Sequence, residues 1–182
     1  EGGVLGGLAD MKEIEIEFPR LHTSPLHVLL FMPKRVPKPV PAILGLNFLG
    51  NHTVHHDPQI SIHKQWRPAS FLSSSAHALP ALSSRGLDHG RWPVEMILKK
   101  GYAIATAYYG DLEPDFPGGW EKGIRAQWAT LCRNPSEVHS SFFQRRSISS
   151  AGPPWSRPND WGAISVWAWS ASRILDCLLE DP

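Results

Sequence analysis

Hydrophobic and polar residues alternate strictly over residues 13–18, the first clear element of the chain. A period of two predicts a strand with one buried and one solvated face, near the edge of a sheet. A second apolar stretch, residues 27–32, follows after a loop of about six residues, a length that suits an antiparallel hairpin. Pro33 ends it, because proline cannot donate to a β-ladder. The pattern therefore predicts that the sheet begins with a β-hairpin.

Two further strands are predicted downstream. Residues 42–48 are continuously apolar, which is typical of a strand covered on both faces. Residues 102–108 carry small side chains at alternate positions, so a helix can pack close above them. Between the two, Pro93 suits a first helical position and Gly101 a helix end, which predicts a short helix. Two parallel strands joined through a covering helix are therefore expected after the hairpin.

The longest helix is predicted at the end of the chain. Asn159 or Asp160 can cap it, and Asp181 before a proline ends it. A shorter helix is indicated near residues 124–131, whereas the rest of residues 125–157 and the serine-rich stretch 70–84 are interpreted as long loops. The apolar face of the last helix is predicted to consist of Ile164, Trp167, Ala168, Ala171, Leu175, Leu178 and Leu179.

Length and charge narrow the class of protein. The 182 residues fit one domain, and we expect residues 1–182 to form a single, incomplete domain. The net charge is +1 and the basic residues are scattered, which argues against nucleic-acid binding and against a basic membrane anchor. Apolar runs fall short of the roughly 20 residues that span a bilayer. Without an initial Met or a signal-peptide pattern, we expect an interior part of a longer soluble protein.

Cysteine and tryptophan usage leave alternatives open. Cys132 and Cys177 are too few and too far apart for a disulfide framework or a zinc ribbon, so buried free thiols are favoured over a disulfide. The eight tryptophans suit a core, and aromatic platforms for sugar rings are the alternative.

The stretch most indicative of chemistry follows the strand at residues 42–48, because ligands collect at the carboxyl ends of strands in open sheets. Gly50, flanked by small polar residues, would let backbone amides approach a developing oxyanion. An ordinary Gly/Asn turn is the alternative, and the residues alone favour it. The candidate oxyanion-side or substrate-side loop consists of Asn47, Phe48, Leu49, Gly50, Asn51 and His52.

Two other groups of polar residues have competing interpretations. His52, His55, His56 and Asp57 resemble a metal-ligand set, but Pro58 and the loop context disfavour helical presentation and no fourth ligand is indicated. No metal and no cofactor are therefore predicted, and histidines that orient neighbours or contact substrate are favoured. Asp111, at the carboxyl end of the strand at residues 102–108, is a candidate for substrate contact or for capping the next segment.

No catalytic residue is predicted within the chain. An α/β-hydrolase carries its serine on a tight turn with the pattern Gly-x-Ser-x-Gly, and that pattern does not occur here. The serines at 73–75 and 140–141 lack glycines at the required offsets, so solvated loop serines are the favoured interpretation. The nucleophile would be expected on the next strand, directly after Pro182.

Four blocks in order carry a family resemblance: residues 44–55, 91–95, 101–111 and 160–169. With stretches such as Leu44-Gly45-Leu46-Asn47-Phe48 and Arg91-Trp92-Pro93-Val94-Glu95, the chain resembles the bacterial glucuronoyl esterases. These carbohydrate esterases cleave 4-O-methyl-glucuronoyl esters that link xylan to lignin. Residues 125–157 do not resemble the family.

The resemblance implies the N-terminal half of an α/β-hydrolase three-layer sandwich, in which an antiparallel hairpin leads into a parallel sheet with covering helices. It also implies a serine esterase that works through an acyl-enzyme, with an Arg beside the Ser. The family's catalytic and main sugar-binding residues fall after the end of this chain, so only the scaffold and the loop at residues 47–52 carry over. The strand at residues 102–108 would then lack its next neighbour, beside Ile104, and the chain alone is expected to aggregate or dimerise.

The implied partners are a glucuronoxylan or lignin–carbohydrate ester and the missing C-terminal half of the same domain. The implied location is secreted or periplasmic. Two alternatives remain at this point: an acetyl xylan esterase-like hydrolase, and a non-catalytic Trp-rich module that binds carbohydrate or another partner.

Overall fold

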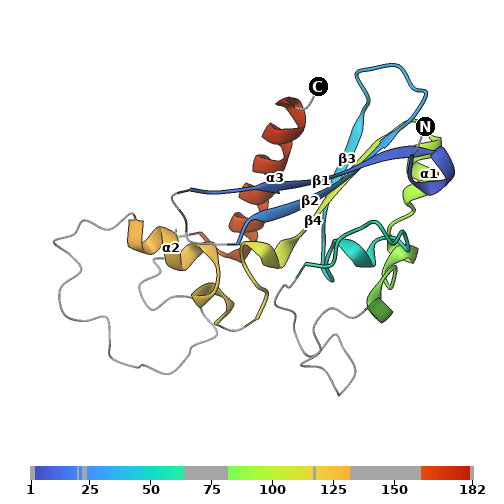
Figure 1. The fold of residues 1–182 in the computed structure, drawn as a ribbon. Coiled ribbons are helices and arrows are strands. Elements are labelled where there is room, and N and C mark those ends of the chain that lie inside the picture. Colours follow the sequence, from blue (N-terminus) through green and yellow to red (C-terminus); the bar gives the residue numbers. More distant parts are fainter. Residues whose placement is uncertain are drawn as a thin grey trace, which may run out of the picture.

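The computed structural model describes residues 3–19, 21, 24–63, 82–116, 118–131 and 161–180. Within these residues four strands form one mixed sheet, and helices lie on both of its faces (Figure 1). The strands are β1 (Ala9–Ile16), β2 (Leu26–Pro33), β3 (Ala42–Asn47) and β4 (Ala103–Tyr108), and the α-helices are α1 (Val94–Lys99), α2 (Ile124–Leu131) and α3 (Ala163–Glu180). Short 3-10 helices are η1 (Leu5–Gly7), η2 (Asn51–Thr53), η4 (Leu82–Ser84), η5 (His89–Arg91), η6 (Tyr109–Asp111) and η7 (Gly119–Glu121).

The predicted hairpin is confirmed. β1 and β2 pair antiparallel over their whole length, with Glu15 directly opposite His27. β1 begins at Ala9, earlier than the alternating pattern indicates, and a bridge from Val4 to Ala9 precedes it. β1 lies at the edge of the sheet, as its polar face predicts.

The strand order β1-β2-β4-β3 corrects two expectations. β4 lies between β2 and β3 and is buried throughout, so the prediction of a vacant position beside Ile104 is wrong. The edge belongs to β3, which pairs only with β4 among the described residues, and the side chain of Ile43 is 43% exposed. The prediction that β3 is covered on both faces is therefore also wrong. A continuous apolar run signals a tendency to be buried and does not say which strand lies beside it.

The side chains of β2 and β4 alternate between two cores. Leu29, Phe31 and Ile104 pack with Val94 and Leu98 of α1 on one face of the sheet. The other face carries the alanines of β4, and it packs against α2 and α3 through Ile124, Val166 and Ile174. α3 makes its close approach to β3, so closer helix packing on the small residues of β4 stays a prediction. The chain has the three layers of an α/β fold.

The predicted last helix is confirmed as α3, but its predicted apolar face is not the face that packs on the sheet. The buried stripe of α3 is Val166, Ser170 and Ile174, spaced four residues apart. Ile164, Leu175 and Leu179 are 75%, 49% and 77% exposed. Since α3 touches the sheet through a narrow stripe that includes a serine, the wider apolar face is left at the surface.

The remaining helix predictions agree with the structure. α2 covers residues 124–131, and α1 begins directly after Pro93 and ends before Gly101, whose positive φ of 82° suits glycine at a helix end. Cys177 is partly buried and forms no disulfide within the described residues, whereas Cys132 and the caps proposed at residues 159–160 lie outside them. Within the part of the chain that the structure describes, no helix is both long and apolar enough to cross a bilayer.

Candidate functional site

The candidate site lies where the two parallel strands end. Asn47, the last residue of β3, pairs with Tyr108, the last residue of β4. The turn after β3 and the 3-10 helix η6 after β4 therefore leave the same edge of the sheet. β2 runs antiparallel to β4, so its first residues, including His27, begin at this edge as well.

The side chain of Asn47 organises the turn. It is fully buried, and its amide nitrogen donates to Asn51 Oδ1 at 2.7 Å and to Thr106 Oγ1 at 3.1 Å. Its oxygen accepts the backbone N–H of Gly50 at 2.8 Å. Asn51 extends the network by donating to the backbone oxygen of His27 at 2.9 Å. The turn is thus tied to both β4 and β2.

The six residues of the predicted loop divide into two groups. Asn47, Gly50, Asn51 and His52 are buried, and the N–H of Gly50 already donates to Asn47. Gly50 has a φ of 98°, a conformation that glycine adopts without strain. Phe48 is 47% exposed and Leu49 is partly buried, so these two form the outward side of the loop. Whether the loop serves an oxyanion remains a prediction.

His52 links the loop to a later segment. Its Nε2 lies 2.9 Å from Ser84 Oγ, and both side chains are buried. The backbone oxygens of His52 and Thr53 accept the N–H groups of Gly86 and Asp88. Although a histidine beside a serine is the pairing that nucleophilic catalysis uses, burial on both sides makes this pair a structural link between loops.

The structure does not bring the predicted histidine group together as one ligand set. His55 Nε2 lies 3.0 Å from Glu95 Oε1, and its Nδ1 accepts the backbone N–H of Asp57. His56 instead packs against the ring of His89, at a centroid distance of 4.5 Å. With His52 committed to Ser84, these side chains face different neighbours. In these contacts the histidines link neighbouring segments, and a role in substrate contact stays a prediction.

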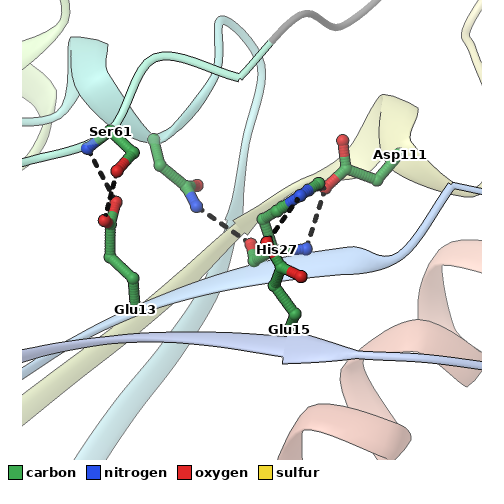
Figure 2. A network of polar contacts seen from close by, with 6 residues as sticks. Glu13, Glu15, His27, Ser61 and Asp111 are labelled. Atoms are coloured by element: carbon green, nitrogen blue, oxygen red, sulfur yellow. Dashed lines mark hydrogen bonds and ion pairs between the residues drawn. The ribbon is translucent and has the colours of Figure 1, made fainter.

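Asp111 does not cap the segment that follows it. Its Oδ2 accepts the backbone N–H of His27 at 3.0 Å and lies 3.2 Å from Nδ1 of the same residue (Figure 2). The carboxylate is fully buried, and Oδ1 has no hydrogen-bond partner among the described residues. Burial raises the pKa of Asp111, against the effect of His27, while the hydrogen bond to Asp111 raises the pKa of His27. Substrate contact by Asp111 remains a prediction.

Sequence reasoning missed a group of three side chains beside this pair. Glu15, His27 and His63 place one potential ligand atom each within 4.8 Å of one another. His63 stacks on His27 with ring centroids 3.8 Å apart, and burial followed by the charge of His27 lowers the pKa of His63. The hairpin register was the available signal, because it sets Glu15 opposite His27, but nothing local indicates that His63 joins them.

Aromatic rings line the outward side of the loop. Phe48 contacts Tyr109 at a centroid distance of 5.1 Å, and Tyr109 contacts Trp167 of α3 edge-on at 5.2 Å. Trp167 donates to the backbone oxygen of Glu113 at 2.9 Å. Burial raises the pKa of the Tyr109 phenol, which stays protonated at neutral pH. The exposed ring of Phe48 thus packs against Tyr109, which in turn packs against Trp167.

A buried ion pair lies next to these aromatic residues. Arg125 of α2 donates from both Nε and Nη2 to Glu113 Oε1, each at 2.6 Å. The Glu113 side chain is fully buried, and burial raises its pKa although Arg125 opposes the shift. The pair fixes α2 beneath the segment that follows η6.

Comparison with known proteins gives a consistent result. No protein-family model matches the chain. A curated relative, "Carbohydrate esterase MZ0003" from an unknown prokaryotic organism, is 32% identical over 97% of this chain and 36% of its own length. The solved structure of a glucuronoyl esterase from Solibacter usitatus is 36% identical, with a TM-score of 0.74, over 100% of this chain and 40% of that one.

A further solved structure, described as a promiscuous CE15 esterase from the marine bacterial metagenome, is 30% identical with a TM-score of 0.69, over 98% of this chain and 39% of that one. The resemblance to the glucuronoyl esterases and the α/β fold class are thereby confirmed. The chain spans between 36% and 40% of the length of these relatives.

Proposed function

We propose that this chain is the N-terminal part of a carbohydrate esterase that hydrolyses glucuronoyl esters of plant cell-wall polysaccharide. The observation that carries the proposal is the likeness to the Solibacter usitatus glucuronoyl esterase, with 36% identity over the whole chain. A serine supplied by polypeptide beyond residue 182 attacks the ester carbonyl, the alcohol leaves, and water hydrolyses the acyl-enzyme. This chain contributes the wall of the pocket.

The carboxyl edge of the sheet supports this role. Catalytic and binding groups of open α/β sheets gather at that edge, where the turn at residues 47–52 leaves β3. The hydrogen bonds of Asn47 hold the turn in one geometry, and a preorganised loop is what stabilisation of an oxyanion requires. Phe48 offers an exposed aromatic face on which the apolar face of a sugar ring can pack.

The open side of the fold supports the need for further polypeptide. β3 pairs only with β4 among the described residues, and α3 exposes Ile164, Leu175 and Leu179. A following strand can hydrogen-bond to β3 while its neighbouring elements cover the exposed face of α3. Because the proposed substrate is a polymer outside the cell, we also propose that the protein is secreted or periplasmic.

The proposal is tested by expressing the open reading frame beyond codon 182 together with this chain. Release of alcohol from benzyl glucuronate and release of acetate from acetylated xylan are measured side by side, with and without a serine-directed inhibitor. We expect inhibitor-sensitive hydrolysis of the glucuronate ester by the long product and none by the 182-residue chain. Turnover by the isolated chain would overturn the proposal.

Loop variants then assign the contribution of this chain. Phe48→Ala in the long product is expected to raise KM for a xylan-linked ester, whereas Leu87→Ala, which alters an exposed residue of another loop, leaves KM unchanged. Hydrolysis of acetate esters alone would replace the proposal with an acetyl xylan esterase. Retention on xylan without any hydrolysis would replace it with a non-catalytic binding module.

A further inference from the structure

Three side chains from separate segments converge beside the candidate site. Glu15 lies on β1, His27 on β2, and His63 in the segment that follows β3. Glu15 and His27 are direct partners across the hairpin, and His27 Nε2 lies 3.6 Å from Glu15 Oε1. One potential ligand atom from each of the three lies within 4.8 Å of those of the other two.

Asp111 fixes the orientation of the His27 ring on the side away from Glu15. Its Nδ1 lies 3.2 Å from the carboxylate of Asp111, whose side chain is fully buried and also accepts the backbone N–H of His27 (Figure 2). In the neutral ring, a carboxylate on one imidazole nitrogen sets the tautomer, so that the other nitrogen, here the one facing Glu15, can bind a metal ion after the ion displaces any proton on it. This carboxylate–histidine arrangement typically stands behind metal-binding histidines and increases their basicity.

His63 is held in place by its own segment. Ser61 donates from its backbone N–H and from its hydroxyl to the carboxylate of Glu13, at 2.8 and 2.6 Å (Figure 2). This anchors residues 61–63 over the strand that carries Glu15. The ring of His63 then stacks on that of His27, at an interplanar angle of 30°.

We propose that Glu15, His27 and His63 bind a divalent transition-metal ion, with Zn²⁺ as the best match. Two imidazoles and one carboxylate are a ligand set that Zn²⁺ prefers, whereas Mg²⁺ and Ca²⁺ favour oxygen ligands alone. Tetrahedral Zn²⁺ with bonds of about 2.0–2.2 Å holds its ligand atoms about 3.3–3.6 Å apart. The distance between His27 and Glu15 already fits, and Glu15, with a side chain 59% exposed, has room to adjust. The ring of His63, which is stacked on that of His27, must turn about its side-chain bonds so that both nitrogen lone pairs point at the ion.

The ion would have a structural role, because it would hold three segments of the chain together. It would join β1, β2 and the segment at residues 61–63 at the edge where Asn51 donates to the backbone oxygen of His27. Since the same edge carries the loop at residues 47–52, metal binding would stiffen one side of the proposed pocket. The site differs from the histidine group considered in the sequence, and it arises from the hairpin register and a long-range contact.

The test is a titration of the metal-free chain with ZnCl₂, followed by calorimetry and by thermal unfolding, with MgCl₂ as the comparison. We expect about one Zn²⁺ per chain and a higher midpoint of unfolding with Zn²⁺ but not with Mg²⁺. Co²⁺ is added separately, because its visible spectrum reports tetrahedral coordination. Glu15→Gln and His63→Gln should each weaken Zn²⁺ binding about tenfold or more.

Glu17→Gln is the matched control, because Glu17 is an exposed carboxylate just past the end of the same strand. It should leave Zn²⁺ binding unchanged. The chain has nine histidines, so binding that persists in both Glu15→Gln and His63→Gln would place the ion elsewhere and overturn the proposal. The absence of saturable binding to the unmodified chain would overturn it as well. Neither outcome bears on the esterase proposal, which is judged by ester hydrolysis.

Discussion

The side-chain oxygen of Asn47 accepts the backbone N–H of Gly50 at 2.8 Å, so the last residue of β3 closes the turn that follows it. The same side chain donates to Asn51 within the turn and to Thr106 on the neighbouring strand. One buried amide therefore sets both the shape of the loop and its position on the sheet.

Asn47→Ala should destabilise the chain by about 1–3 kcal/mol, because it leaves buried polar partners without hydrogen bonds. Thr106→Val, which removes only one of these bonds and keeps the side-chain shape, should cost less. Urea unfolding of the two variants beside the parent checks the order. Equal stability of Asn47→Ala and the parent would show that the network contributes nothing to the fold.

Arg125→Met should be strongly destabilising, by about 3–5 kcal/mol, since it strands the buried carboxylate of Glu113 without a positive partner. The double variant Glu113→Gln/Arg125→Met should lose less than Arg125→Met alone, because the unpaired charge is gone. A double-mutant cycle from denaturant unfolding measures the coupling. Additive losses would mean that the two side chains act independently.

The Glu95 carboxylate gives a pH dependence with a defined sign. Its pKa is lowered by a hydrogen bond from its own backbone N–H at the start of α1 and then by His55. A lowered carboxyl pKa adds stability that is present above the unfolded value, about 4.3, and is lost as pH falls through the folded value. Because Glu95 is half exposed, the contribution should stay below about 1 kcal/mol.

Thermal unfolding of Glu95→Gln and of the parent across the acid range checks this expectation. The two should differ at neutral pH and converge at low pH, whereas Glu180→Gln, an exposed change on α3, should follow the parent throughout. A difference that grows on acidification would contradict the assigned sign.

The exposed apolar residues of α3 predict self-association of the isolated chain. Leu175→Lys/Leu179→Lys should raise the dissociation constant of the dimer at least about tenfold, because burying one leucine contributes about 1.5–3 kcal/mol. The unfolding midpoint should not fall, since both side chains face outward. Sedimentation velocity measures the association.

Ile174→Lys serves as the contrasting variant, because Ile174 is fully buried against the sheet and its replacement should unfold the chain. A parent chain that sediments as a monomer at all concentrations would contradict the prediction of self-association.

The site could be predicted only in part. The position of the loop at residues 47–52 follows from an apolar strand that leads into Gly and Asn, and the structure confirms that it leaves the carboxyl edge of the sheet. The internal bonding of Asn47 and the pairing of His27 with Asp111 could not be predicted. Asn47 and Thr106 lie 59 positions apart in the chain and His27 and Asp111 lie 84 apart, and only the folded sheet brings these pairs together.

Local sequence signals were sufficient to predict most of the elements and the resemblance to the glucuronoyl esterases. Alternation in β1, the proline and glycine that bound α1, and the helical period of α3 are local signals, because they depend on backbone geometry within a few residues. Tertiary structure alone decided that β4 is central, that β3 forms the edge, and that α3 packs through Val166, Ser170 and Ile174. Strand order and helix rotation depend on which distant surfaces meet, and an apolar side chain favours burial without specifying its partner.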